Sequence, residues 1–491
     1  MDTQSNKNLS ILMLLVGMLL VGFSMGHWLA PLAAWIGPVL IMRYYRDQKA
    51  GRGFLLVFTA YIPAFLIGFG GIWSAMIPIL IIIPILAIFY ALLWSLPYLA
   101  DRLLSQRIKG FSSTFVYPLA AATLELVNIH VNPVGMWGAT GFTQYGNLAL
   151  MQLASVTGMI GITFLMGWAA SVANWAWENR GSMTEVRRGL GVFGAVLGVV
   201  LIFGFARLNL SHSHDIEKTV RVAGIIGESQ DIVYERVSEI SDPAAARIDV
   251  LSHWEAYFSQ TVREAQAGAK IIIWPEGAGL SFSPEETSSL ISRAQEVARN
   301  NNVYLAIGLG LYYEGPIMEP PNKLLLIDPT GEIVMDHSKY GFMFQYGGNK
   351  ILQAVDTPFG VVSGVICWDL DFPAVIQQAG RNGTGLFLLP GNDWIEIDPI
   401  HSQMGVFRAI ENGMSIVRLA DHSLSMTVDP YGRILAQTDS FSSTDKTMIA
   451  QVPTKHVATF YTAFGHWLEW LAPIGLLYFT FRSWSLSRQR A

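Results

Sequence analysis

Two apolar patterns divide the chain, and the first consists of long, nearly unbroken apolar segments. These segments fill residues 1–210 and return at 460–485. A helix that crosses a bilayer needs about 20 mostly apolar residues. The pattern therefore predicts a membrane domain with eight spanning helices. They are expected at residues 10–26, 29–43, 54–73, 76–99, 112–130, 153–177, 189–207 and 462–482.

Residues 211–459 show the second pattern, in which short β-rich apolar runs alternate with amphipathic stretches. Residues 246–268 and 283–301 have helical spacing, whereas "DPTGE" and "DPYGR" are typical of tight turns between hairpin strands. Continuous apolar strands that alternate with helices indicate a layered α/β fold with both sheet faces covered. Strands are predicted in "VRVAGIIG", "AKIIIWPE", "VYLAIGLGL", "NKLLLIDP", "GVVSGVICW", "GLFLLPG", "SIVRLAD" and "SLSMTVDP".

Composition agrees with this division. Hydrophobic residues make up 52% of the chain and charged residues 14%, whereas a soluble domain carries about 25% charged residues. We therefore expect a seven-span membrane domain at 1–210, a globular domain at 211–459, and the eighth span with a tail at 460–491. No basic stripe suggests a nucleic-acid partner. The single cysteine excludes an intrachain disulfide, and the histidines lack metal-ligand spacing, so no metal site is expected.

Arginine and lysine concentrate in alternate loops. The loops after the second, fourth and sixth predicted spans and the tail "RSWSLSRQR" are rich in them, whereas the loops after the first, third and fifth contain none. Positive charge collects on the cytoplasmic side of a membrane. Both termini are therefore predicted to be cytoplasmic, and residues 211–459 to lie on the periplasmic or extracellular face.

Glu125 lies inside or near the end of the fifth predicted span. A carboxylate at membrane depth suggests a functional role. A packing contact with a polar neighbour is an equally good interpretation, and the sequence leaves both open.

Three predicted strand ends carry reactive side chains. Glu276 ends "IIIWPEG", Lys339 follows the "DPTGE" hairpin, and Cys367 ends "GVVSGVICW". A thiol has a pKa of about 8.5 and needs a base to become a nucleophile at neutral pH. A carboxylate can take its proton, and an ammonium can stabilise the thiolate and then an oxyanion. These three residues are the candidate catalytic set, with Lys323 and Lys350 as rivals to Lys339.

The motifs "WPEG", "HSKY" and "GVICWDLDFP", in this order, resemble the Glu–Lys–Cys motifs of the nitrilase, or carbon–nitrogen hydrolase, superfamily. Eight spans with the α/β domain before the last resemble the apolipoprotein N-acyltransferase family in particular. The similarity extends to "WGATGFTQYGNLALMQLASVTGMIGITFL" and "FRAIENGMSIVRLADHSLSMTVDPYGRIL". The resemblance implies a polytopic α-helical membrane domain joined to a nitrilase-like α-β-β-α sandwich.

The same resemblance implies the chemistry. Cys367 would attack the acyl ester of a phospholipid, with Glu276 as base and Lys339 stabilising the oxyanion, helped by the backbone N–H of Trp368. The resulting thioester would pass its acyl group to the N-terminal amine of a diacylglyceryl-cysteine lipoprotein. No cofactor would be needed, and the enzyme would work as a monomer in the bacterial inner membrane. Trp368, Asp369 and Trp394 are the candidate substrate-binding residues, although Asp369 and Trp394 could equally be structural.

The sequence departs from the family at the substrate cleft. Gly347 stands where these acyltransferases usually carry a Glu, with Gln345 and Asn349 nearby, and His422 replaces a smaller residue. We expect residues 341–348, "GFMFQYGG", to form an apolar flap that meets lipid. The departures put the acceptor in doubt more than the chemistry. The alternatives are an amidase or acyltransferase with another acceptor, and a lipid-binding relative that has lost catalysis.

Overall fold

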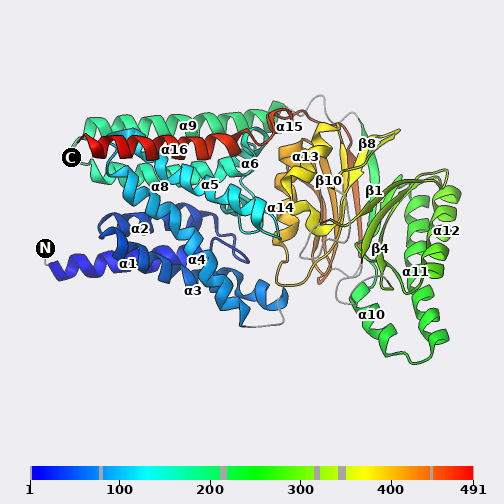
Figure 1. Ribbon diagram of the computed structural model, residues 1–491. Helices are drawn as coiled ribbons and strands as arrows, with labels where there is room; N and C mark the ends of the chain where they lie inside the picture. Colours follow the sequence, from blue (N-terminus) through cyan, green and yellow to red (C-terminus); the bar gives the residue numbers. More distant parts are fainter. Residues whose placement is uncertain are drawn as a thin grey trace. The chain divides into compact units, whose positions relative to one another are not determined.

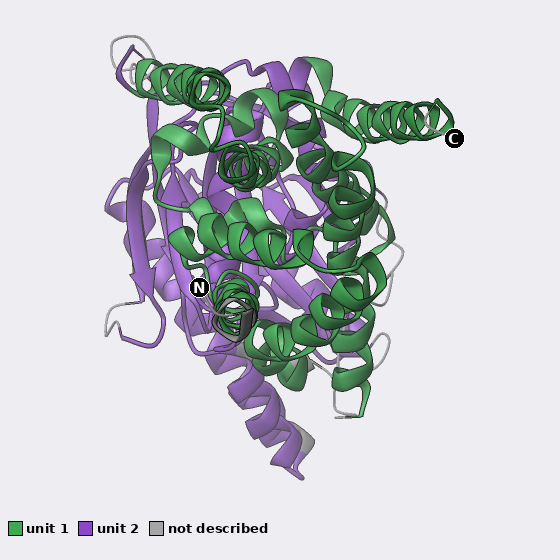
Figure 2. Ribbon diagram, turned by 90° about the vertical axis from the view of Figure 1, so that its left-hand side faces the viewer, with its two compact units in different colours: residues 1–208, 464–491 green, residues 209–463 purple. Residues whose placement is uncertain are grey.

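The computed structural model forms two compact units, distinguished by colour in Figure 2. One unit comprises Met1–Leu208 with Phe464–Ala491, and the other comprises Asn209–Ala463. The residues that the structure describes are 3–76, 81–210, 218–313, 321–340, 350–442 and 446–489.

The first unit is helical, and a helix occupies each of the eight positions where the apolar pattern predicts a span (Figure 1). Four described helices are long and apolar enough to cross a membrane, and the bent pair Leu148–Thr157 and Ile160–Glu178 would make a fifth. The helix at Pro31–Arg46 has 16 residues, and the apolar helix Asn8–Gly22 is also short, so the number eight stays a prediction. The helices are α1 (Thr3–Gly22), α2 (Pro31–Arg46), α3 (Ala50–Met76), α4 (Ile82–Ala100), α5 (Val116–Val131), α6 (Leu148–Met151), α7 (Ala154–Thr157), α8 (Ile160–Glu178), α9 (Met183–Leu210) and α16 (Trp467–Arg488).

An ion-pair cluster, in which Arg46 and Asp101 are buried and Glu178 is exposed, joins three segments of this unit. Arg46, at the end of α2, donates to both carboxylate oxygens of Asp101 at 2.8 Å, and its third nitrogen lies 3.2 Å from Glu178. Asp101 directly follows α4, and Glu178 ends α8. The chain segments after the second, fourth and sixth predicted spans therefore meet at one end of the helical unit.

Glu125 is buried in α5 and caps a neighbouring turn. Its Oε1 accepts the backbone N–H of Thr140 at 2.8 Å, and Thr140 is the first residue of a short 3-10 helix, Thr140–Gln144. This contact supports the packing interpretation of Glu125. A carboxylate that accepts a hydrogen bond from an N–H without an intrahelical partner, at a helix start, also interacts favourably with the helix dipole.

The second unit contains two β-sheets. The first has the strand order β13-β1-β2-β4-β5-β6, with β3 paired to β4, and the second has the order β12-β11-β10-β9-β8-β7. Every run predicted as a strand contains one, and the two predicted turns join the antiparallel pairs β5–β6 and β11–β12. The strands are β1 (Thr219–Ile225), β2 (Ile271–Ile273), β3 (Gly279–Ser281), β4 (Tyr304–Leu311), β5 (Asn322–Ile327), β6 (Ile333–Ser338), β7 (Ala354–Thr357), β8 (Gly360–Gly364), β9 (Leu386–Asn392), β10 (Ser415–Asp421), β11 (Leu424–Val428), β12 (Ile434–Asp439) and β13 (Thr447–Pro453).

Helices cover the outer faces of both sheets, which confirms the expected α-β-β-α layers (Figure 1). The alternation of side chains along β2 shows why its run is apolar throughout. Ile271 and Ile273 belong to the core between the sheets, whereas Ile272 packs in the core beneath α11 and α12. A strand buried on both faces needs apolar side chains at every position. The helices are α10 (Gln230–Glu239), α11 (Pro243–Gln266), α12 (Pro284–Asn301), α13 (Pro373–Arg381) and α14 (Ile400–Asn412), and α15 (Phe460–Phe464) follows β13.

Helix α12 begins where the sequence pattern predicts a helix, at residues 283–284. Ser283 is the N-cap, and its hydroxyl accepts the backbone N–H of Glu286 at 3.1 Å. The carboxylate of Glu286 accepts the N–H of Phe282 in return. This reciprocal capping satisfies two backbone donors that a helix start leaves without partners.

Candidate active site

The three candidate catalytic residues follow three different strands, as predicted. Glu276 lies in the loop after β2, Lys339 directly follows β6, and Cys367 comes three residues after the end of β8. β2 and β6 belong to one sheet and β8 to the other. The site therefore draws residues from both sheets, an arrangement that strand-end positions alone could not indicate.

Lys339 and Glu276 form a buried ion pair. The Lys339 Nζ lies 2.7 Å from the Glu276 Oε1, and both side chains are less than a tenth exposed. The two rival lysines lie elsewhere: Lys323 pairs with Asp336 on an exposed part of the β5–β6 hairpin, and Lys350 lies over the ring of Tyr340. Of the three lysines, Lys339 is thus the one in contact with Glu276.

Two asparagines complete the surroundings of Glu276. Asn322 donates its Nδ2 to Oε1 at 2.6 Å, and the backbone N–H of Asn392 donates to Oε2 at 3.0 Å. The carbonyl oxygen of Asn392 lies 3.9 Å from the Cys367 Sγ. One residue therefore contacts both the carboxylate and the thiol.

Cys367 sits in a strained turn. Its φ of 46° lies in the left-handed region, which costs a non-glycine residue energy and is frequent at functional sites. Burial raises the pKa of the thiol, and the negative charge of Glu276 raises it further. His401 and Lys339 act in the opposite direction on this pKa. The neutral thiol is therefore favoured, and a base is needed to generate the nucleophile.

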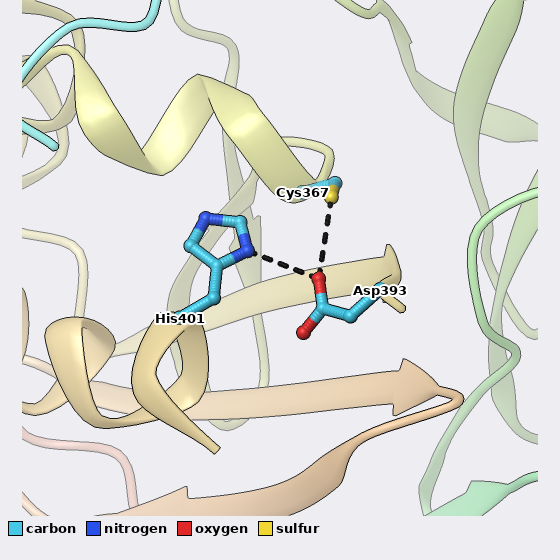
Figure 3. A group of neighbouring side chains, drawn as sticks. All are labelled: Cys367, Asp393 and His401. Carbon is cyan, nitrogen blue, oxygen red and sulfur yellow. Dashed lines mark hydrogen bonds and ion pairs between the residues drawn. The ribbon is translucent and has the colours of Figure 1, made fainter. Parts of the chain in front are cut away.

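A buried charged cluster lies next to the thiol (Figure 3). The Asp393 Oδ1 is 3.8 Å from the Cys367 Sγ and 3.0 Å from the His401 Nδ1. Arg418 donates to both oxygens of Asp393 at 2.8 and 2.7 Å. The other nitrogen of His401 lies 3.1 Å from Asp371. Two carboxylates, an imidazole and a guanidinium therefore meet in the interior beside the thiol.

Opposite charges in this cluster shift the pKa values of His401 and Asp393 towards their ionised forms. Burial would lower the pKa of His401 and so does Arg418, yet the carboxylates of Asp371 and Asp393 raise it well above its usual value. Burial would raise the pKa of Asp393, but Arg418 and His401 hold it well below its ordinary range. These directions favour an imidazolium paired with the Asp393 carboxylate, whereas burial raises the pKa of Asp371 on the other side of the ring.

Cys367, Asp393 and His401 are close enough together to be considered as metal ligands, because one potential ligand atom from each lies within 4.8 Å of the others. The position of Arg418 argues against such a site. Its guanidinium already contacts both oxygens of Asp393 and lies 2.9 Å from the His401 Nδ1. A cation placed there would face a fixed positive charge, so the donor set suits the ion pairs better than a metal.

Asp369, a candidate substrate-binding residue, is fully buried. Its Oδ1 accepts the backbone N–H of Tyr340 at 2.8 Å. Its Oδ2 accepts the N–H of Ile366 at 3.2 Å and lies 2.8 Å from the His337 Nε2. His337 and Tyr340 lie on either side of Lys339 in the chain, and Ile366 directly precedes Cys367. The carboxylate thus joins the two segments that carry the ammonium and the thiol, and no surface of it faces a substrate.

The two candidate tryptophans lie together. The rings of Trp368 and Trp394 are 5.3 Å apart, and Trp368 also lies 5.5 Å from the ring of His401. Trp368 is buried, whereas Trp394 is half-buried and its Nε1 has no hydrogen-bond partner among the described residues. Of the two, Trp394 is the one with surface left for a substrate.

Several predictions at the cleft fall outside the described residues. These are the apolar flap at 341–348 and the departures at Gln345, Gly347 and Asn349. His422 is described: its φ is 52°, and its Nδ1 lies 3.8 Å from the Asp231 Oδ2. Asp231 also accepts the Nδ2 of Asn392, which connects His422 to the site.

Sequence reasoning missed Asn322, Asn392, Asp393, His401 and Arg418. Asn392 and Asp393 stand in "PGNDW" at the end of β9, beside β8 in the same sheet, so the strand-end argument applied to this run would have found them. Asn322 opens β5, and its contact with Glu276 spans strands that are not neighbours in the chain. No local pattern marks such a contact.

The chain matches two family profiles and is similar to several known proteins. The profile of the carbon-nitrogen hydrolase family matches residues 240–461, and that of the apolipoprotein N-acyltransferase N-terminal domain matches residues 15–172. A protein of Geobacter metallireducens named apolipoprotein N-acyltransferase is 25% identical over 75% of this chain and 73% of its own. One of Rhodopseudomonas palustris with the same name is 28% identical over 72% of this chain and 69% of its own. An amidase from Nesterenkonia sp., of known structure, is 19% identical, covers 50% of this chain and 94% of its own, and has a TM-score of 0.39.

Proposed function

Because the chain belongs to the apolipoprotein N-acyltransferase family of the nitrilase superfamily, we propose that it moves an acyl chain from a phospholipid to the N-terminal amine of a diacylglyceryl-cysteine lipoprotein. Family membership implies lipid and lipoprotein substrates in a membrane. The observation that carries the proposal is the buried Lys339–Glu276 ion pair, which shares a contacting residue, Asn392, with the single thiol of the chain.

The proposed first step forms a thioester. Glu276 takes the proton of Cys367, and the sulfur attacks the ester carbonyl of the phospholipid. The Lys339 ammonium stabilises the oxyanion together with the backbone N–H of Trp368. The C–O bond breaks, and the departing lysophospholipid oxygen takes the proton from Glu276. Burial and Glu276 raise the pKa of Cys367, which explains why the step needs a positioned base.

The proposed second step transfers the acyl group. The acceptor amine attacks the thioester carbonyl, the C–S bond breaks, and the proton released by nitrogen passes through Glu276 to sulfur. We propose Asp369 as a positioning residue in place of the substrate contact that the sequence suggested, since its carboxylate is occupied by Tyr340, Ile366 and His337. Trp394 remains the proposed substrate contact.

We also propose eight membrane spans, cytoplasmic termini and a catalytic domain on the outer face of the bacterial inner membrane. The alternation of basic loops supports this orientation. The cluster of Arg46, Asp101 and Glu178 adds to that support, because it brings three of the basic segments to the same end of the helical unit. Two lipid-anchored substrates could then reach the site from the membrane.

The experiment looks for the thioester. The full-length protein in detergent is incubated with a phospholipid that carries one defined acyl chain, and the peptide containing Cys367 is weighed by mass spectrometry. We expect a hydroxylamine-labile mass increase equal to that acyl group. The adduct should be absent in Cys367→Ala. It should be unaffected in the control variant Lys323→Met, which changes a lysine outside the site.

Adding a diacylglyceryl-cysteine peptide should then remove the adduct and produce an N-acylated peptide. A wild-type protein that never acylates Cys367 would show instead a lipid-binding protein without catalysis. An adduct that forms but is passed to a different amine and never to this peptide would favour an acyltransferase with another acceptor.

A further inference from the structure

Two amide oxygens beside Glu276 lack hydrogen-bond partners among the described residues: the Oδ1 atoms of Asn322 and Asn392. The orientation of the Asn322 amide is fixed by chemistry. A carboxylate only accepts hydrogen bonds, so the NH₂ group must face the Glu276 Oε1, and the oxygen must face away. In the same way, the Nδ2 of Asn392 donates to Asp231 and its oxygen remains.

These unpaired oxygens belong to the site and not to the apolar core. Asn322 is 7% exposed. A Cβ added to Gly310 would lie 3.6 Å from its Oδ1, 3.5 Å from the Gly277 Cα and 3.2 Å from the ring of Tyr312. Gly277 directly follows Glu276 in the chain. A methyl group at position 310 would therefore lie next to this oxygen, to the glycine that follows the proposed base, and to an aromatic ring.

A buried acceptor without a donor is costly, and native proteins rarely leave one without a reason. Here two such acceptors belong to the two asparagines that hold the two oxygens of the carboxylate. One group within reach of both oxygens would satisfy them if it carried two hydrogens to donate. A primary amine fits, because it presents two N–H donors and keeps a lone pair for attack.

We propose that the Oδ1 atoms of Asn322 and Asn392 bind the primary amine that accepts the acyl group, an inference that rests on the proposed function. The amine donates its N–H groups to these oxygens, and its lone pair is directed at the thioester on Cys367. The nitrogen forms the new C–N bond, the C–S bond breaks with its electrons remaining on sulfur, and Glu276 carries the released proton to sulfur. An alcohol has one O–H and can satisfy one acceptor, so the site favours the amine over the lysophospholipid hydroxyl that would reverse the first step.

Separate measurements of Cys367 acylation and of transfer to the amine distinguish amine binding by Asn322 from simple support of Glu276. Asn322→Ala removes both the acceptor oxygen and the hydrogen bond to Glu276. Gly310→Ala leaves Asn322 in place and puts a methyl group beside its oxygen. The full-length protein is loaded with a phospholipid acyl chain, the rate of Cys367 acylation is measured, and transfer to a diacylglyceryl-cysteine peptide is then timed.

We expect Gly310→Ala to acylate Cys367 at the wild-type rate and to transfer about tenfold more slowly, the order of one lost hydrogen bond. Asn322→Ala should slow transfer more than acylation. The matched control is Asn301→Ala, at an asparagine whose side chain bonds within α12; it should change neither rate. With an N-methylated acceptor peptide, which offers one N–H, the difference between wild type and Asn322→Ala should shrink.

Equal slowing of both half-reactions in Asn322→Ala, with normal transfer in Gly310→Ala, would overturn the inference and leave Asn322 as a support for Glu276. Should Gly310→Ala not fold, the comparison of methylated and unmethylated acceptors in Asn322→Ala decides alone: an undiminished difference overturns the inference. A wild-type protein without any thioester refutes the proposed function, a result recognised before transfer is measured.

Discussion

The thiol of Cys367 experiences opposing influences from individual neighbours. Burial and Glu276 disfavour its ionised form, whereas Lys339 and His401 favour it. Glu276 and Lys339 form an ion pair with each other, so removing either one leaves the other acting alone on the sulfur. The two residues should therefore have effects of opposite sign on thiol reactivity.

This opposition can be measured by alkylation. Lys339→Met should raise the pKa of Cys367 further, and Glu276→Gln should lower it, because the thiolate is the reactive form. Rates of reaction with iodoacetamide across pH 6 to 10 should shift to higher pH in the first variant and to lower pH in the second. Lys323→Met, which removes a surface lysine, should retain the wild-type profile. Shifts of the same sign in both active-site variants would contradict this account.

A second prediction at the residue scale concerns the pH dependence of stability and follows from the raised pKa of His401. The pKa of His401 in the folded chain is raised by Asp371 and Asp393 above the unfolded value of about 6.5. Its stabilising contribution is therefore complete below that pH and is lost as the pH rises towards the folded pKa. Asp393, whose pKa is lowered, contributes in the opposite sense and loses its contribution only in acid.

Between pH 6.5 and 9 the midpoint of thermal unfolding should therefore fall more for the wild type than for His401→Gln. Unfolding of the detergent-solubilised protein, followed by tryptophan fluorescence, would show it. His422→Gln serves as the control, because His422 lies outside this cluster, and it should follow the wild type. Parallel pH dependence in the wild type and His401→Gln would mean that His401 is neutral in the fold.

At the scale of elements, the site depends on the contact between the end of β6 and the turn that begins at Cys367. Asp369 makes this connection through the backbone of Tyr340 and Ile366 and the ring of His337. The two segments belong to different sheets. The positions of the ammonium and the thiol thus depend on one buried carboxylate.

Asp369→Ala should lower the unfolding midpoint by several degrees, because two buried backbone N–H groups lose their acceptor at a cost of about 1–3 kcal/mol each. Acylation of Cys367 should slow with little change in KM, since no substrate contact is removed. Asp328→Ala is the matched control: that carboxylate also accepts backbone N–H groups, but in a half-buried turn where water can replace it. A raised KM with unchanged stability would return Asp369 to the substrate site.

At the scale of the whole molecule, the single cysteine makes the proposed orientation easy to test. Cys367→Ala gives a chain without thiols, into which one reporter can be introduced. Ser288→Cys lies on the exposed surface of α12, and Ser182→Cys lies in the segment before α9. In intact spheroplasts a membrane-impermeant maleimide should label the first and not the second. The reverse result would place the catalytic domain in the cytoplasm.

The sequence was sufficient for local features and for the resemblance. Ile271–Ile273 and Leu386–Asn392 are strands because their runs are apolar on both faces, and the hairpin turn at Asp328 follows from its residue types. Glu276, Lys339 and Cys367 were predicted as catalytic residues from strand ends and motifs, and their catalytic role stays a prediction. Arg418 and Asn322 were not, because each acts through a contact between distant segments, and neither lies in a pattern that signals polar chemistry.

The first and last strands of the catalytic unit are neighbours. β1 pairs with β13 along its whole length, from Thr219 opposite Pro453 to Ile225 opposite Thr447. The chain thus enters and leaves the sandwich through adjacent strands, an arrangement that tolerates insertion of one domain into another. Because both ends of the unit leave from adjacent strands, it can be connected to its flanking helices without a change in either sheet. The same property makes the unit suitable for grafting onto a different anchor.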